Sequence, residues 1–316
     1  MLSKITMVIT FSAIFMAFLL CSPSVAVSRT RLPLPSPITG PESLAFDRNG
    51  EGPYVGVSDG RILKYVGPRG FQEYGYTSPT RNKTLCDGLA DFSEVQAQCG
   101  RPLGLRFNHQ TNELYVADTY FGLVKIGPNG GVPIQSFKIL QPQENRGNFT
   151  FDFLDGIDID MDTGIIYLTQ ASANFRCRDA RAVENSRDET GSLFSVDPKK
   201  NETRVLMRGL ALAAGVAVSR DGSFVVVSEY LANRIRRTNS RGQFWVAVND
   251  VLEPNPPSRP AIIPRGLRVG QNGVVSRIVS LVRELGSETV SEVHEHNGTL
   301  YSGSLHASYV SISTVF

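Results

Sequence analysis

A pentapeptide at residues 56–60 has the letters of a hydrolase motif. It reads Gly-Val-Ser-Asp-Gly, and such a motif presents a nucleophilic serine only where a strand, a sharp turn and a helix surround it. Here alternating apolar residues stand on both sides, which is the pattern of a β-hairpin. We therefore interpret the pentapeptide as a tight turn and not as a serine nucleophile.

Histidines and aspartates suggest two further kinds of chemistry. His294 and His296 share one strand face, with His306 nearby, and a metal ion accepts such nitrogens as ligands. No cysteine or third ligand stands at a suitable spacing, so solvated or structural histidines are the favoured interpretation. Asp158 and Asp160 also share a face, and there the capping of turns is a simpler role than acid–base catalysis.

The chain that must position these residues has the composition of a globular protein. It contains 316 residues, of which 41% are hydrophobic, and its formal net charge is +2. This composition excludes a disordered chain, a coiled coil and a collagen-like fibre. The near-neutral charge argues against nucleic acid as the main partner, because phosphate binding needs clustered Lys and Arg.

The first segment, residues 1–26, is typical of a secretory signal peptide. Lys4 precedes the almost wholly apolar run Ile5–Leu20, and Ser24-Val25-Ala26 supplies the small residues that a signal peptidase recognises. The run is shorter than the ~20 residues that span a bilayer, which favours a cleaved signal over an anchor. We expect residues 27–316 to form a single domain without a membrane span, a monomer that acts on a small molecule.

Two other features agree with the secretory route. Four asparagines begin N-glycosylation acceptor sequences: Asn82, Asn148, Asn201 and Asn297. The mature chain keeps three cysteines, of which Cys86 and Cys99 bracket a short polar segment. An oxidising compartment favours a local bridge there over two unpaired thiols, and Cys177 is left over as a free thiol.

A pattern of two short strands around an Asn/Asp–Gly turn recurs along the domain. The second strands begin near residues 54, 114, 166, 224, 244 and 300, and each is rich in Tyr, Val and Phe or similar residues. Antiparallel repeats of about 50 residues are typical of β-propellers. We predict an all-β, six-bladed β-propeller with little helix. The polar residues 176–188 are expected to form a solvated excursion between strands.

One interval breaks this repeat. Phe224 and Phe244 stand 20 residues apart, whereas every other interval exceeds 50 residues. A four-stranded blade does not fit into so short a segment. We therefore predict an abbreviated fifth blade, which leaves an unpaired strand edge and exposed apolar surface.

Several motifs resemble the plant strictosidine synthase-like family. They are Gly40-Pro41-Glu42-Ser43, residues 56–65, Cys99-Gly100-Arg101-Pro102-Leu103-Gly104, residues 153–158 and Glu295-His296-Asn297-Gly298. The resemblance covers nearly the whole mature chain apart from the shortened fifth repeat. It implies a six-bladed propeller with a Cys86–Cys99 disulfide. It also implies passage through the endoplasmic reticulum to the vacuole or to the outside of the cell.

The founding activity of that family is the condensation of tryptamine with the aldehyde secologanin in alkaloid biosynthesis. The resemblance implies a catalytic glutamate four residues before the stretch that corresponds to 295–298. That position is Ser291 here, and serine alone is not a comparable base. Glu288 reaches the pocket only if its loop rearranges. Glu292 is expected to face away, because neighbouring residues of a strand point to opposite sides.

The wider superfamily implies a second activity, the hydrolysis of lactones and esters with a central calcium or similar cation. Such an ion polarises a carbonyl group and activates water. Glu42 and Asp155 match two of its four ligand positions, Ala214 replaces a third, and the fourth falls in the missing segment. The resemblance therefore implies at most a weakly bound Ca²⁺.

Three hypotheses about function remain open. The first is a small-molecule hydrolase of ester or lactone type that uses Glu42, Asp155 and an ion. The second is the condensing enzyme, a carbon–nitrogen lyase, with Glu288 or Glu292 in the role of the missing glutamate. The third is a binding or defence-related propeller without catalysis. The hydrolase is favoured over the condensing enzyme because the family's glutamate is Ser291.

Overall fold

The computed structural model describes residues 29–137, 153–179, 182–183, 185–237, 244–252, 261–270 and 274–314. The predicted signal peptide and the acceptor Asn148 lie outside these described residues. No helix in the described part is long and apolar enough to cross a membrane.

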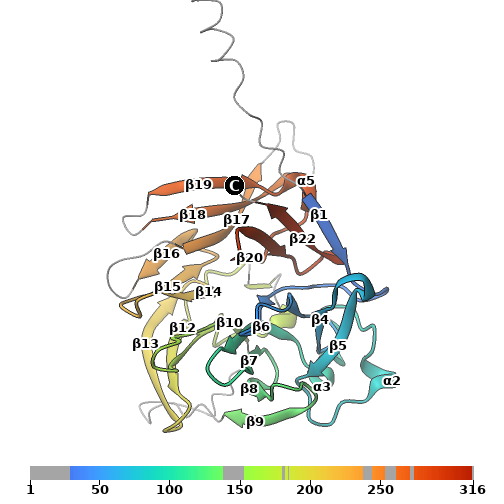
Figure 1. Ribbon diagram of the computed structural model, residues 1–316. Helices are drawn as coiled ribbons and strands as arrows, with labels where there is room; N and C mark the ends of the chain where they lie inside the picture. Colours follow the sequence, from blue (N-terminus) through green and yellow to red (C-terminus); the bar gives the residue numbers. More distant parts are fainter. Residues whose placement is uncertain are drawn as a thin grey trace, which may run out of the picture.

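Six small antiparallel sheets form the predicted six-bladed propeller, with the chain running from one blade to the next (Figure 1). The first three sheets have four strands each. The first sheet contains β2 (Leu44–Ala45), β3 (Tyr54–Gly56), β4 (Arg61–Tyr65) and β5 (Phe71–Tyr76), and the second contains β6 (Pro102–Asn108), β7 (Glu113–Asp118), β8 (Gly122–Ile126) and β9 (Pro133–Phe137). The third sheet contains β10 (Leu154–Ile159), β11 (Ile166–Gln170), β12 (Gly191–Asp197) and β13 (Glu202–Leu210).

The last three sheets differ in size. The fourth sheet contains β14 (Ala213–Val218), β15 (Val225–Glu229) and β16 (Arg234–Arg237). The fifth contains β17 (Phe244–Leu252), β18 (Ala261–Val269) and β19 (Val275–Ser280), and the sixth contains β20 (Glu292–His296), β21 (Thr299–Gly303) and β22 (Tyr309–Thr314). The N-terminal strand β1 (Arg29–Pro33) completes the sixth sheet by pairing with β22, so the two ends of the described chain close the ring (Figure 1).

Helix is limited to short turns, as the sequence predicts. The described helical segments are α2 (Lys83–Cys86), α3 (Gln96–Cys99), α5 (Val282–Leu285) and two 3₁₀ turns, η1 (Gly67–Arg69) and η2 (Cys177–Asp179), and residues 182–183 are helical as well. Helices α2 and α3 flank the loop that the Cys86–Cys99 disulfide closes.

The shortening affects two neighbouring sheets and not only the fifth. Within the described residues, the fourth and the fifth sheet have three strands each. The segment at 244–247, predicted as a second strand, begins β17, which lies at one edge of its sheet. Compared with the four-stranded repeat, the fourth sheet therefore lacks its last strand, and the fifth sheet lacks its first strand.

Apolar side chains pack between successive blades. Buried clusters join sheets one and two, two and three, three and four, five and six, and six and one, while no cluster of the described residues joins sheets four and five. Ile278 on β19 is 59% exposed and Val251 on β17 is 60% exposed. The missing strands thus leave apolar surface uncovered, as the broken repeat predicts.

A buried glutamate holds the three-stranded fourth sheet together. Glu229, at the end of β15, accepts bonds from Arg234 Nε at 2.7 Å and from the Ala211 N–H at 2.9 Å, and Arg236 Nε lies 2.6 Å from it. Burial raises the pKa of this carboxyl, but the bonds from Arg234 and Ala211 and the charge of Arg236 outweigh it, so the pKa lies below its usual value.

Replacing Glu229 by glutamine should lower the free energy of unfolding by about 2 kcal/mol, between the effects of an exposed and a buried ion pair. The stabilisation by Glu229 is present above the unfolded pKa and is lost as the pH falls through the lower folded pKa, so the wild type and the variant should converge in acid. Urea unfolding at pH 7 and at pH 3 measures both effects. Glu202→Gln, at an exposed position of β13, is the control and should change stability by less than about 0.5 kcal/mol. Equal stabilities at pH 7 would contradict the prediction.

Candidate functional site

The first strands of the blades approach one another through their backbones. A Cβ on Gly104 of β6 would lie 2.3 Å from the carbonyl oxygen of Asp155, and a Cβ on Gly156 of β10 would lie 2.5 Å from that of Ala214. Real Cβ atoms do not come so close, so only glycine permits this packing. Neighbouring blades therefore meet at fixed backbone positions around the centre of the ring.

An irregular register at the start of β10 places Asp155. The pairing of β10 with β11 shifts between Leu154 and Ile157, and the Gly156 N–H donates to Thr169 Oγ1 at 2.7 Å. A bulge of this kind re-aims the side chains beside it. Asp155 is thereby held by its backbone within reach of charged groups from other blades.

Three carboxyl groups form what we call the acidic centre: Glu42, Asp155 and Glu292, from the first, third and sixth blades. The pKa of Glu42 lies well above its usual value because of burial, the nearby Asp155 and, to a smaller extent, Glu292. Burial is also the main reason that the pKa of Asp155 rises to about 7. The positive charge of Arg101 lowers this pKa in part, and the negative charge of Glu292 raises it further. A carboxyl that titrates near neutral pH suits proton transfer.

Arg101 supplies the positive charge next to this centre and is fully buried. Its Nε and Nη2 donate to the two oxygens of Asp91 at 2.6 and 3.0 Å, and its Nη1 donates to the Pro102 carbonyl at 3.3 Å. A guanidinium has five N–H donors. Two of them therefore have no protein acceptor among the described residues.

An apolar cluster from four blades lies beside the charged groups. It consists of Leu103, Phe153, Ala171, Cys177 and Val183, with Phe175, Leu212, Leu231 and Leu305 packed against them. Cys177 and Val183 belong to the segment predicted as a solvated excursion, and that prediction is wrong for these two side chains, which are 4% and 0% exposed. Their burial follows from a contact with distant blades that local polarity does not reveal.

The positions predicted for the catalytic glutamate have different surroundings. Ser291 precedes β20, and its Oγ accepts the Leu305 N–H at 3.0 Å. Glu292 does not face away from the centre as expected, since its charge raises the pKa of both other acidic groups and its Oε2 accepts the Leu44 N–H at 2.9 Å. The alternation rule fails because β20 begins only at Glu292. Glu288 is exposed on the turn after α5.

The donor set does not fit a resident metal ion. Among the described residues, no three His, Cys, Asp or Glu side chains lie together in a way that could hold one. The Arg101 guanidinium stands beside Glu42 and Asp155 and already reduces their repulsion. His294 and His296 contact other groups, since His296 stacks on Phe46 with ring centroids 3.9 Å apart. We therefore derive no step through a metal.

Other predicted positions have clear structural roles. Cys86 and Cys99 form a disulfide, and Cys177 is a buried free thiol whose pKa burial raises to about 12. Residues 57–60 form a tight turn, in which the Gly60 N–H donates to the Val57 carbonyl at 3.1 Å. Asp160 caps a turn by accepting the Asp162 N–H at 2.9 Å.

Asp158 has a role between blades. Its Oδ1 lies 2.8 Å from Arg106 Nε of the second blade, and its Oδ2 accepts the Val218 N–H of the fourth blade at 2.8 Å. Of the glycosylation acceptors within the described chain, Asn82, Asn201 and Asn297 are all exposed.

Sequence reasoning missed Arg101 and Asp91 as site residues. Arg101 was visible as a charge at the start of an apolar strand, directly before Pro102. Asp91 stands in a polar loop where nothing in the sequence distinguishes it from its neighbours. Their pairing depends on how the loop folds over the ring.

Comparison with known proteins agrees with this architecture. The family model described as strictosidine synthase matches residues 155–243, and the model for the N-terminal part of strictosidine synthase-like proteins matches residues 28–65. Strictosidine synthase-like protein 11 of Arabidopsis thaliana is 37% identical over 89% of this chain and 90% of its own length. The chain belongs to the strictosidine synthase-like family.

Other members of the strictosidine synthase-like family match almost as well. Strictosidine synthase-like protein 12 of Arabidopsis thaliana is 36% identical and covers 96% of both chains. The strictosidine synthase of Catharanthus roseus is 31% identical over 88% of this chain and 84% of its own length.

Solved structures confirm the fold class. A gluconolactonase from Xanthomonas campestris superposes with a TM-score of 0.57 over 92% of this chain and 91% of that one, at 11% identity. A virginiamycin B lyase from Staphylococcus aureus gives a TM-score of 0.52, also at 11% identity. At such identities the likeness concerns the fold alone.

Proposed function

We propose that this strictosidine synthase-like protein hydrolyses a small ester or lactone at the acidic centre. The observation that carries the proposal is that Asp155, whose pKa is raised to about 7, lies within the electrostatic influence of the buried Arg101, two of whose N–H groups have no protein acceptor among the described residues. One group accepts a proton near neutral pH, and the other stabilises negative charge. Hydrolysis needs both.

The roles of the two residues follow from this chemistry. The Asp155 carboxylate takes a proton from a water molecule, and the water oxygen attacks the carbonyl carbon of the substrate. The N–H groups of Arg101 donate to the developing oxyanion. The ester C–O bond then breaks, and the proton passes from Asp155 to the leaving alkoxide. The apolar cluster around Cys177 covers the non-reacting part of the substrate.

The charge balance of the site predicts which substrates it prefers. Glu292 adds negative charge beside the ionised form of Asp155, while Asp91 already neutralises Arg101. An anionic ester is therefore repelled, and a neutral ester or lactone is preferred.

The test is a hydrolysis assay with neutral and anionic aryl esters and with neutral lactones, each with EDTA and with added Ca²⁺. We expect turnover of the neutral substrates that EDTA does not lower. Absence of turnover on all of them would refute the proposal. A rate that depends on added Ca²⁺ would refute the assignment of the chemistry to Asp155 and Arg101 alone.

A second candidate is the condensation of an amine with an aldehyde. The similarity to the Catharanthus roseus strictosidine synthase favours it, and so does the negative charge of Glu292 and of ionised Asp155, which attracts an ammonium group. Product from tryptamine and secologanin would support this function in place of hydrolysis. Inertness in both assays would leave a binding propeller.

The secretory route belongs to the same proposal. The disulfide and the three exposed acceptor asparagines suit a protein that folds in the endoplasmic reticulum and continues to the vacuole or the outside of the cell.

A further inference from the structure

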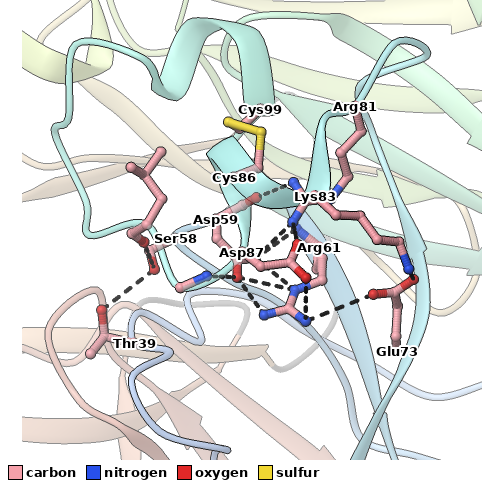
Figure 2. Close-up of polar contacts among 12 residues, drawn as sticks. Thr39, Ser58, Asp59, Arg61, Glu73, Arg81, Lys83, Cys86, Asp87 and Cys99 are labelled. Atoms are coloured by element: carbon pink, nitrogen blue, oxygen red, sulfur yellow. Dashed lines mark hydrogen bonds and ion pairs between the residues drawn. A yellow bond between two sulfur atoms is a disulfide. The ribbon is translucent and has the colours of Figure 1, made fainter.

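The loop closed by Cys86 and Cys99 is fastened to the first blade at its base. The carboxylate of Asp59 is fully buried and accepts the Gly88 N–H at 2.9 Å and Arg61 Nη2 at 2.6 Å (Figure 2). Arg81 donates to the Asp59 carbonyl at 2.6 Å and to Asp87 at 2.5 Å. The base of the loop therefore cannot shift without breaking buried charged contacts.

The far part of the loop turns back toward the ring through Gln96, which is fully buried. Its Nε2 donates to the Ser58 carbonyl at 2.8 Å and to Asp91 Oδ1 at 2.9 Å. Its Oε1 accepts the Phe92 N–H at 3.3 Å. The loop therefore holds the Asp91 carboxylate, which also binds Arg101.

Asp91 is the group that fixes the plane of the Arg101 guanidinium. The backbone of Arg101 is held separately, since its N–H donates to Asp118 Oδ2 at 2.8 Å. The single bond from Nη1 to Pro102 leaves rotation of the guanidinium open. Only the two hydrogen bonds to the Asp91 carboxylate fix both the position and the orientation of the Arg101 guanidinium.

A glycine makes room for this contact. A Cβ on Gly40 would lie 2.6 Å from Asp91 Oδ2 and 2.8 Å from Arg101 Nη2, and the φ of Gly40 is +71°. The ring backbone therefore passes directly over the ion pair, so that the pair is enclosed from the first blade as well.

We propose that Asp91 is a positioning residue that aims Arg101 at the acidic centre, and that the Cys86–Cys99 loop serves to hold Asp91 in place. The effect on turnover rests on the proposed function, but the contact itself does not. Without Asp91, the guanidinium is free to pair with Asp155 or Glu42, which removes the oxyanion donor and holds the base in its ionised, weakly basic form.

Two variants in the same loop separate positioning from general effects. Asp91→Asn removes the carboxylate, and Glu94→Gln makes the same chemical change at an exposed position three residues away. For ester hydrolysis, Asp91→Asn should lower kcat at least 10-fold with KM within 3-fold, and should move the midpoint of the pH profile below the wild-type value. Glu94→Gln should leave kcat, KM and the midpoint of the pH profile unchanged. Asp91→Glu should recover part of the kcat that Asp91→Asn loses.

A second readout does not depend on the substrate. Cys177 is 4% exposed and lies in the field of Arg101 and Asp91. Alkylation of Cys177 by iodoacetamide, followed by peptide mass spectrometry, should be at least 10-fold faster in Asp91→Asn and in the double variant Cys86→Ser/Cys99→Ser than in the wild type or Glu94→Gln. If Cys177 in Asp91→Asn is alkylated at the wild-type rate, the proposal is overturned. No ester turnover in any form, with the expected alkylation, would refute only the proposed function.

Discussion

Asp155→Asn should reduce ester hydrolysis by ~10²- to 10⁴-fold, the usual contribution of a positioned general base. In the wild type, the ionised form of Asp155 accepts the proton, and burial raises its pKa to about 7. The rate should therefore rise as the pH increases through about 7 and level off above it. Initial rates between pH 5 and 9 measure the profile.

Asp162→Asn is the matched control for this variant, because it makes the same change on an exposed turn at the end of the same strand. It should keep the wild-type rate and pH midpoint. Both proteins should unfold at similar denaturant concentrations, so that a loss of rate is not a loss of fold. An Asp155→Asn rate within 3-fold of the wild type would exclude Asp155 as the base.

Gly104→Ala should lower the free energy of unfolding by about 3 kcal/mol, at the upper end for an overpacked site. The added Cβ would lie 2.3 Å from the Asp155 carbonyl oxygen, which is backbone and cannot swing aside. The second and third blades would have to separate, and Asp155 would move with them. Denaturant unfolding measures the stability, and the ester assay measures the movement of Asp155.

Gly127→Ala is the matched control for the packing effect. A Cβ at Gly127 meets only the side chain of Ile134, at 3.8 Å, an ordinary contact distance. Its stability should stay within about 0.5 kcal/mol of the wild type. Equal stabilities of the two glycine variants would show that the blades do not meet through Gly104.

The strands and turns could be predicted from the sequence because they depend on neighbours in the chain. The alternation at 103–107 and 114–117 makes β6 and β7, and the turn at 57–60 forms as its glycines suggest. The disulfide agrees with the family resemblance. The 20-residue interval showed that strands were missing, but not that the loss is shared by the fourth and fifth sheets.

The candidate site could be predicted only in part. The family resemblance points to Glu42 and Asp155, and the two carboxyl groups do interact through their charges. Glu292 was assigned the wrong direction, because its orientation depends on where β20 begins and on the Leu44 N–H from another blade. Cys177 and Val183 are buried by residues of distant blades.

The sequence by itself determined a repeating β-structure, its ring of six blades and the fact that the ring is shortened, since these follow from local periodicity and spacing. Only the tertiary structure decided the chemistry of the centre. The pKa of Asp155 depends on burial and on charges at Arg101 and Glu292, which lie in other blades. The orientation of Arg101 depends on Asp91, which the closed loop brings to it. Contacts of this kind exist only once the ring has closed.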